Sequence, residues 1–171
     1  PMLELSGAGW ALAVIAAIAV VAGQGGALLP ETGEDMTNLS ASLRAAGESD
    51  LRVSLRNYRP LGFGVSARLF VNGAHMPADV ILAARAALLA AFSFDARDLG
   101  QGVSQAQIIA TLQAVPGVEG VDLDALYLGT TPSLQPRLRA ALGRPDPHGA
   151  LPVAAELLTL DPARLHLEVA A

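Results

Sequence analysis

Apolar and polar residues alternate with a period of two along several parts of the chain, which predicts β-strands. Leu51–Tyr58 and Phe63–Asn72 each place apolar residues on one side and polar residues on the other. The Pro- and Gly-containing sequence between them, residues 59–62, is typical of a turn. The two strands are therefore expected to form an antiparallel hairpin. Val118–Leu128 has the same alternation and predicts a further strand.

Apolar residues spaced three and four positions apart predict helices. A short amphipathic helix, which Asp35 or Thr37 can cap, is expected to end at Ala46. Ala78–Ala91 is rich in Ala and Leu and begins beside Pro77, so it predicts the longest helix.

A third helix is expected after Ser104. Ser104 and Gln107 have the spacing of a capping box, in which each side chain binds the backbone N–H of the other residue. Apolar residues continue the helical spacing to Val115, and Pro116 and Gly117 end it.

The two ends of the chain differ from this middle. Trp10–Ala22 is an unbroken apolar run without a preceding basic segment, and we interpret it as a buried segment that ends as a strand near Ile18–Ala22. A membrane span over Leu5–Leu29 is the alternative. The turn at Gly23–Gly26 lacks the Lys and Ser/Thr of a phosphate-binding loop.

Prolines dominate the sequence after Tyr127 and predict a long ordered arm with one short helical piece near Pro136–Leu142. Ala154–Val169 predicts a turn at Asp161-Pro162 and a C-terminal strand. The expected fold class is α+β, with a small mixed sheet containing the hairpin, two main helices and the arm. The expected organisation is an apolar N-terminal segment and Gly-rich turn (1–30), a core domain (31–128), and the proline-rich arm with the C-terminal strand (129–171).

Composition narrows the possible functions. The chain has 171 residues, 52% hydrophobic, and a net charge of −5. Its 11 basic residues are all Arg, and the acidic balance argues against a nucleic-acid-binding protein. Because the chain has no Cys, disulfides, Cys-ligated zinc and thiol catalysis are excluded.

Asp122 and Asp124 are the strongest candidates for chemistry. On a strand they share a face at about 7 Å, a separation that some carboxylate pairs use. No His lies nearby in sequence and no third acid has metal-ligand spacing, so we interpret both as exposed acids. A small hydrolase using Asp122, Asp124 and His148 is the alternative. We expect no catalytic residue, no metal ligand and no cofactor.

The sequences NYRPLGFGVSARLFVN, FSFDARDLGQGVSQAQIIATLQAVPGVEGVDLDALYL and LPVAAELLTLD, in this order, resemble the baseplate J-like assembly proteins of contractile phage tails and related injection systems. The resemblance extends from about Ile18 to Val169. It implies a non-enzymatic structural subunit of a baseplate wedge, assembled in the bacterial cytoplasm. The chain would correspond to the C-terminal portion of a longer member, or to a short member.

The resemblance also implies partners. These are copies of the chain or related wedge subunits, with sheath, hub and spike proteins as further candidates, and neither nucleic acid nor membrane. We expect the hairpin, the loop of residues 95–102 and the arm to contact these neighbours, with an acidic partner for the arginines. The candidate interface residues are Arg52, Arg56, Arg68, Arg97, Asp98, Gln101, Arg137, Arg139 and Arg144.

Overall fold

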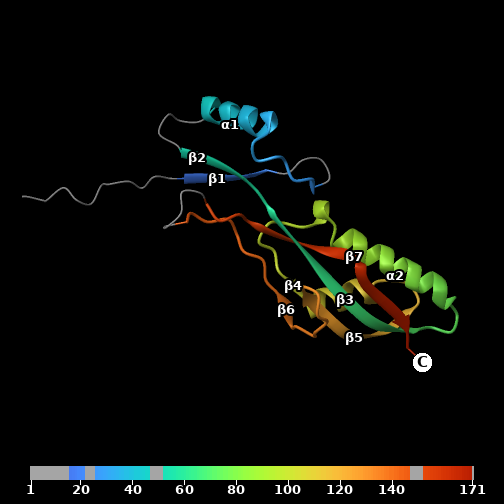
Figure 1. Ribbon diagram of the computed structural model, residues 1–171. Helices are drawn as coiled ribbons and strands as arrows, with labels where there is room; N and C mark the ends of the chain where they lie inside the picture. The colour runs from blue at the N-terminus through green and yellow to red at the C-terminus, as the bar shows by residue number, and fades with distance from the viewer. Residues whose placement is uncertain (1–15, 22–25, 47–51, 147–151, 171) are drawn as a thin grey trace, which may run out of the picture.

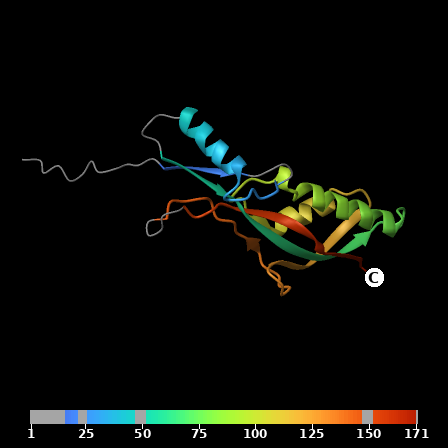
Figure 2. The same ribbon diagram turned by 45° about the horizontal axis from the view of Figure 1, so that its top comes forward.

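The computed structural model of the protein describes residues 16–21, 26–46, 52–146 and 152–170. These residues form two parts that lie next to each other along the long axis of the molecule (Figures 1 and 2). The smaller part contains β1 (Ala16–Val21), β2 (Arg52–Asn57) and α1 (Glu34–Ala46). The larger part is a three-stranded sheet covered by α2 (Pro77–Ala91) and α3 (Gln105–Gln113), which confirms the predicted α+β class.

The sheet of the larger part is mixed. Its central strand, β3 (Arg59–Val71), lies between β5 (Val118–Leu128) and β7 (Glu156–Val169). β5 runs antiparallel to β3, and β7 runs parallel to it. The alternation predicted for β3 is confirmed, because Phe63, Val65, Ala67 and Leu69 are buried while Arg68 and Phe70 are exposed.

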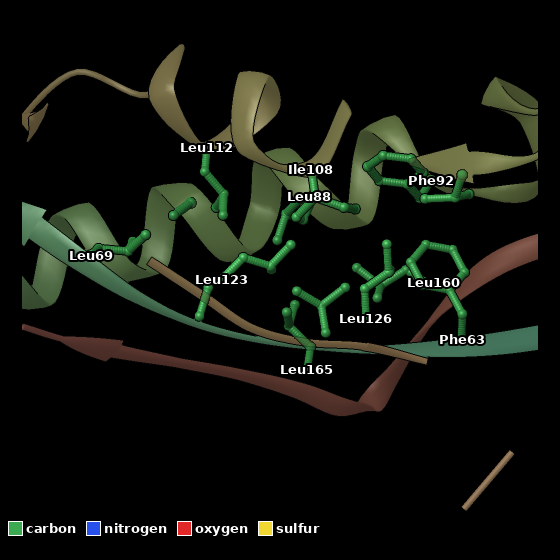
Figure 3. Close-up of a cluster of buried hydrophobic side chains, with 14 of the residues drawn as sticks. Phe63, Leu69, Leu88, Phe92, Ile108, Leu112, Leu123, Leu126, Leu160 and Leu165 are labelled. Carbon is green, nitrogen blue, oxygen red and sulfur yellow. The ribbon is translucent and has the colours of Figure 1, made fainter. Parts of the chain in front are cut away.

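The hydrophobic core lies between this sheet and the two helices (Figure 3). α2 packs against β7 and α3 packs against β5. Phe63 and Phe92 meet edge to face, with ring centroids 5.5 Å apart. Each fully buried Leu, Ile or Phe stabilises the fold by about 1.5 to 3 kcal/mol relative to an exposed side chain. Those buried completely in this core include Phe63, Leu69, Leu88, Ile108, Leu112 and Leu126.

The predicted hairpin is wrong. β2 pairs in parallel with β1, whereas β3 begins two residues after the end of β2 and pairs with β5 and β7. The predicted turn at residues 59–62 lies inside β3, where Gly62 is opposite Thr159. A Cβ on Gly62 would lie only 2.6 Å from Nη2 of Arg164. This glycine therefore allows a side chain to approach the strand and does not mark a turn.

The predicted short helix near residues 136–142 is also wrong. This part of the arm forms β6 (Arg137–Leu138), which pairs antiparallel with β4 (Val103–Ser104). Leu138 is 1% exposed and belongs to the core. Burial of Leu138 thus anchors the arm to the sheet domain, and the arm also follows the outer edge of β5 through two hydrogen bonds to the backbone of Leu126.

The predicted C-terminal strand is confirmed as β7. Residues 161–164 do not form a chain-reversing turn but bulge out of β7, because Phe63 is opposite Leu160 and Val65 is opposite Leu165. β7 therefore continues beyond the bulge to Val169 and completes the sheet.

The three other predicted helices are confirmed, although α3 ends at Gln113, two residues before the predicted Val115. α2 begins at Pro77, and α3 has the full capping box, with Gln107 N donating to Ser104 Oγ (3.3 Å) and Ser104 N donating to Gln107 Oε1 (2.9 Å). α1 begins at Glu34, so Asp35 and Thr37 lie inside the helix and the predicted caps are wrong.

The apolar N-terminal run is described only at residues 16–21. These form β1, which confirms a strand there, while residues 10–15 and most of the Gly-rich turn lie outside the described residues. Within the described ranges, no helix has the length and apolar character needed to cross a membrane.

Candidate functional site: the arm surface

The loop of residues 97–102 is held in place by Arg97. Its Nη2 donates to the backbone oxygens of Gln101 (3.1 Å) and Gly102 (2.7 Å), and the guanidinium lies 5.3 Å from the ring centre of Phe92. Its Nε is buried and has no hydrogen-bond partner. Burial lowers the pKa of Arg97, but an arginine remains charged at any physiological pH. Arg97 therefore fixes the shape of this loop.

The loop in turn contacts the arm. Gly100, at a φ of +73°, donates its N–H to Glu156 O (2.8 Å) at the start of β7. Glu156 exchanges two hydrogen bonds with the backbone of Ala141, accepting one through its carboxylate (2.8 Å). A Cβ on Gly102 would lie 2.7 Å from Leu138 O, so only glycine allows the loop and β6 to approach this closely. Loop and arm thus form one continuous surface.

An open pocket of about 300 Å³ lies between the loop and the arm. Gly100 and Gly102 line one side, and Arg137, Arg139 and Ala140 line the other. Within the described parts of the chain, the guanidinium groups of Arg137, Arg139 and Arg144 have no ion-pair or hydrogen-bond partner. Their charges are available to a group from outside the molecule, and a carboxylate is the natural one.

Exposed apolar side chains accompany these arginines. Leu134, Leu142 and Val153 are 52%, 68% and 38% exposed. We call the loop of residues 97–102, residues 134–144 and Val153 together the arm surface. A surface that combines exposed aliphatic side chains with free arginines has the composition of a protein-binding site.

The other predicted interface residues either belong to the loop of residues 97–102 or lie outside the arm surface. Asp98 and Gln101 belong to the loop, where Asp98 N donates to Gln101 Oε1 (3.1 Å). Arg56 forms an ion pair with Glu31 (3.2 Å) in the smaller part. Arg52 belongs to β2, and its side chain lies outside the described residues.

Arg68 lies on the face of the sheet that α2 and α3 do not cover. Its Nη2 lies 2.6 Å from Asp122 and 2.8 Å from Asp124. The hydrogen bonds that Arg68 donates to Asp124 and the charges of both aspartates raise the pKa of Arg68. The structure thus places the two acids on one face, as predicted, and bridges them with an arginine.

Both acids are bound by Arg68. Among the described residues, no three His, Cys, Asp or Glu side chains are close enough together to hold a metal ion. His148, the third member of the hydrolase alternative, lies outside the described residues.

Two positioning arginines were missed by the sequence reasoning. Arg85 on α2 donates to Pro162 O (2.8 Å) and Leu165 O (3.2 Å), and Arg164 in the bulge donates to Gly62 O (2.7 Å). The apolar part of the arm surface, Leu134 and Leu142, was also missed. In the sequence, this apolar part is indicated only by single leucines among prolines and arginines.

Comparison with solved structures finds a related fold. The chain is similar to one chain of the cryo-EM structure of the anti-feeding prophage (AFP) baseplate, 6-fold symmetrised, with a TM-score of 0.59 and 19% sequence identity. The similarity covers 87% of this chain but only 30% of that chain. The likeness therefore concerns the fold, and this chain spans less than a third of its neighbour. No family model and no curated protein matches the sequence.

Proposed function

We propose that this protein is a structural subunit of a baseplate in a contractile tail or related injection system, and that it acts through protein–protein interfaces. The observation that carries the proposal is the fold similarity to a chain of the AFP baseplate, which covers 87% of this chain. Fold alone does not determine function. The proposal therefore also needs a surface suited to assembly.

The arm surface is such a surface. The buried Leu138 anchors the middle of the arm surface to the sheet domain. The surface is therefore held in one conformation and loses little conformational entropy when it binds. Its exposed leucines provide apolar area, and Arg137, Arg139 and Arg144 provide charge without partners in the described chain. Arginine and exposed apolar side chains are enriched where proteins bind one another.

The specific role we propose is that of a wedge subunit, whose neighbours are further copies or related wedge subunits, with sheath, hub and spike proteins as additional partners. The particle would assemble in the bacterial cytoplasm. In this role the chain needs no cofactor and no catalytic residue. Of the predicted interface residues, the three arginines of the arm are the ones we assign to direct contact.

The experiment is recovery of the tagged protein from its native host without detergent, followed by mass spectrometry and negative-stain microscopy. The wild type is expected to copurify with sheath, tube or spike proteins and with baseplate-like particles. The R137Q/R139Q/R144Q variant should lose these partners. The control R44Q removes an exposed arginine from α1, far from the arm surface, and should behave as the wild type.

Two results would contradict the proposal. One is recovery of the wild type without any tail component. The other is recovery only from detergent-solubilised membranes, which would instead favour the membrane alternative and direct attention to the apolar run of residues 10–22.

A further inference from the structure

Charged side chains are distributed unevenly between two surfaces of the larger part. The arm surface carries three arginines without partners, as described above. On the uncovered face of the sheet, Arg68 lies among several carboxylates, whereas Arg164 and Asp161, which lie over Gly62 on the same face, form an ion pair with each other (2.7 Å). We call the part of this face around Arg68 the open face; its charged residues are Arg68, Asp122, Asp124 and Glu168, and the exposed Glu119 follows on β5 beside Gly120.

Some carboxylate oxygens of the open face accept no hydrogen bond from the described residues. Arg68 lies between its acids, with Asp122 opposite it on β5 and Glu168 opposite it on β7. Arg68 binds both oxygens of Asp124 but only Oδ2 of Asp122. Glu168 is exposed and has no partner among the described residues. One guanidinium therefore leaves most of the negative charge of this face uncompensated.

The open face also has an apolar group. Phe70 is 47% exposed and packs over Gly120, where a Cβ would lie 3.2 Å from its ring. An exposed aromatic ring within an acidic surface matches the arm surface, where exposed leucines lie among arginines. The two surfaces are complementary both in charge and in apolar groups.

Within one molecule, the arm arginines form no ion pair with the acids of the open face in the described residues. Asp122 and Glu168 lie opposite Arg68 of β3, while the arm follows β5 near Leu126, which lies opposite Val65. At the strand rise, these three residues of β3 correspond to about 10 Å along the sheet. Both surfaces therefore remain available to a second molecule.

We propose that the arm surface of one copy of this chain binds the open face of a second copy. Arg137 and Arg139 then meet Asp122 and Glu168 of the other molecule, and the exposed leucines of the arm cover Phe70. Because the two surfaces differ, the contact is heterologous, and it either repeats from copy to copy or closes on itself. The inference rests on the proposed function only in treating the chain as an assembly subunit.

The test uses the purified protein and sedimentation velocity over a concentration series. The wild type is expected to self-associate, and association should weaken as salt rises from about 0.05 to 0.5 M, because salt screens exposed charges. R137E/R139E and, separately, E119R/E168R should each weaken self-association at least tenfold. R44E changes the charge by the same amount per residue, away from both surfaces, and should leave association unchanged.

Mixing the two charge-reversed variants is the decisive step. The acidic arm of one variant meets the basic open face of the other, so the mixture should associate although each variant alone does not. Restoration also shows that both variants are folded. The uncharged variant R137Q/R139Q should weaken association less than R137E/R139E does.

Three results would overturn the inference. The first is a monomeric wild type at about 1 mM, where a contact with a millimolar dissociation constant would already be half formed. The second is association that neither charge reversal changes, and the third is a mixture that stays monomeric. Each leaves the proposed baseplate function standing, because recovery with tail components is measured independently in the host.

Discussion

Single arginines fix the backbone of this protein at the places where strands and loops depart from regular geometry. Arg97 binds two carbonyls of the loop, Arg85 binds two carbonyls of β7, and Arg164 binds the carbonyl of Gly62. A guanidinium suits this role because it has five donors in a fixed plane. The absence of Lys from the chain is consistent with this use of arginine.

Replacing Arg97 with Gln is expected to lower the free energy of unfolding by about 1 to 3 kcal/mol, because hydrogen bonds from a charged group are lost and carbonyls lose their donors. Urea unfolding measures the loss. Hydrogen exchange should accelerate at residues 98–102 before other parts of the chain. R44Q is the control, and equal stability of R97Q and R44Q would contradict the positioning role.

Gly102 is a second residue whose identity the arm requires. In Gly102→Ala the new Cβ would lie 2.7 Å from the backbone oxygen of Leu138, so β4 and β6 must separate. We expect a loss of about 1 to 3 kcal/mol in thermal or urea unfolding. Gly73→Ala is the matched control, because a Cβ there meets no atom within 4 Å. The explanation fails if both variants are equally stable.

Asp161 should make stability depend on pH in acid. Hydrogen bonds from Arg164 Nε (2.7 Å) and Ala163 N (3.0 Å) lower the pKa of Asp161 below its usual 3.8. A depressed folded-state pKa stabilises the protein above the unfolded value, and this contribution is lost as pH falls through the folded value.

The wild type should therefore exceed D161N in stability at pH 6 by about 0.2 to 1 kcal/mol, the range for exposed ion pairs. The difference should shrink as the pH falls below about 4. Urea unfolding at a series of pH values measures it. A difference that stays constant down to pH 2 would show that titration of Asp161 is not its source.

Among the elements, those defined by local spacing could be predicted and those defined by distant partners could not. The period-two pattern gave the bounds of β5, and the residues Ser104 and Gln107 gave the start of α3. The partners of β3 are β5 and β7, more than 40 residues away along the chain, and no local signal identifies them. Locally, Pro60 and Gly62 are typical of a turn. In the structure they lie in a strand, where Arg164, about a hundred residues later, donates to the carbonyl of Gly62.

In the candidate site, too, local features could be predicted from the sequence and contacts between distant segments could not. Arg137, Arg139 and Arg144 could be singled out from the sequence because they lie together in a proline-rich segment. The convergence of Arg137 and Arg139 with Gly100 and Gly102 around a pocket could not be predicted, because it depends on the pairing of β4 with β6. Tertiary burial of Leu138 overrides the helical tendency of the segment around it.

The capping box of α3 provides a prediction at this scale. Ser104→Ala removes the acceptor for Gln107 N and should cost about 0.5 to 2 kcal/mol in urea unfolding. Ser104→Thr retains the hydroxyl and should recover most of the stability. If the two variants unfold at the same urea concentration, the cap does not stabilise α3.

At the scale of the whole molecule, the smaller and larger parts are joined by two consecutive strands. β2 and β3 are separated only by Tyr58, whose ring lies 5.5 Å from that of Phe94 in the larger part. Among the side chains that the structure describes, the hydrophobic core contains residues of the larger part alone, from Leu61 to Leu167. α1, β1 and β2 therefore pack beside a core that is already complete.

A shortened chain of residues 58–171 is thus expected to fold. It keeps the core and loses the hydrogen bond from the Tyr58 hydroxyl to Gly26 O, so its free energy of unfolding should fall by only about 1 to 2 kcal/mol. Thermal unfolding followed by circular dichroism should remain cooperative. The methyl resonances of Ile108, completely buried between α3 and the sheet, should keep the chemical shifts of the full chain. Collapsed methyl dispersion or a gradual melt would mean instead that the smaller part is required for the sheet to form.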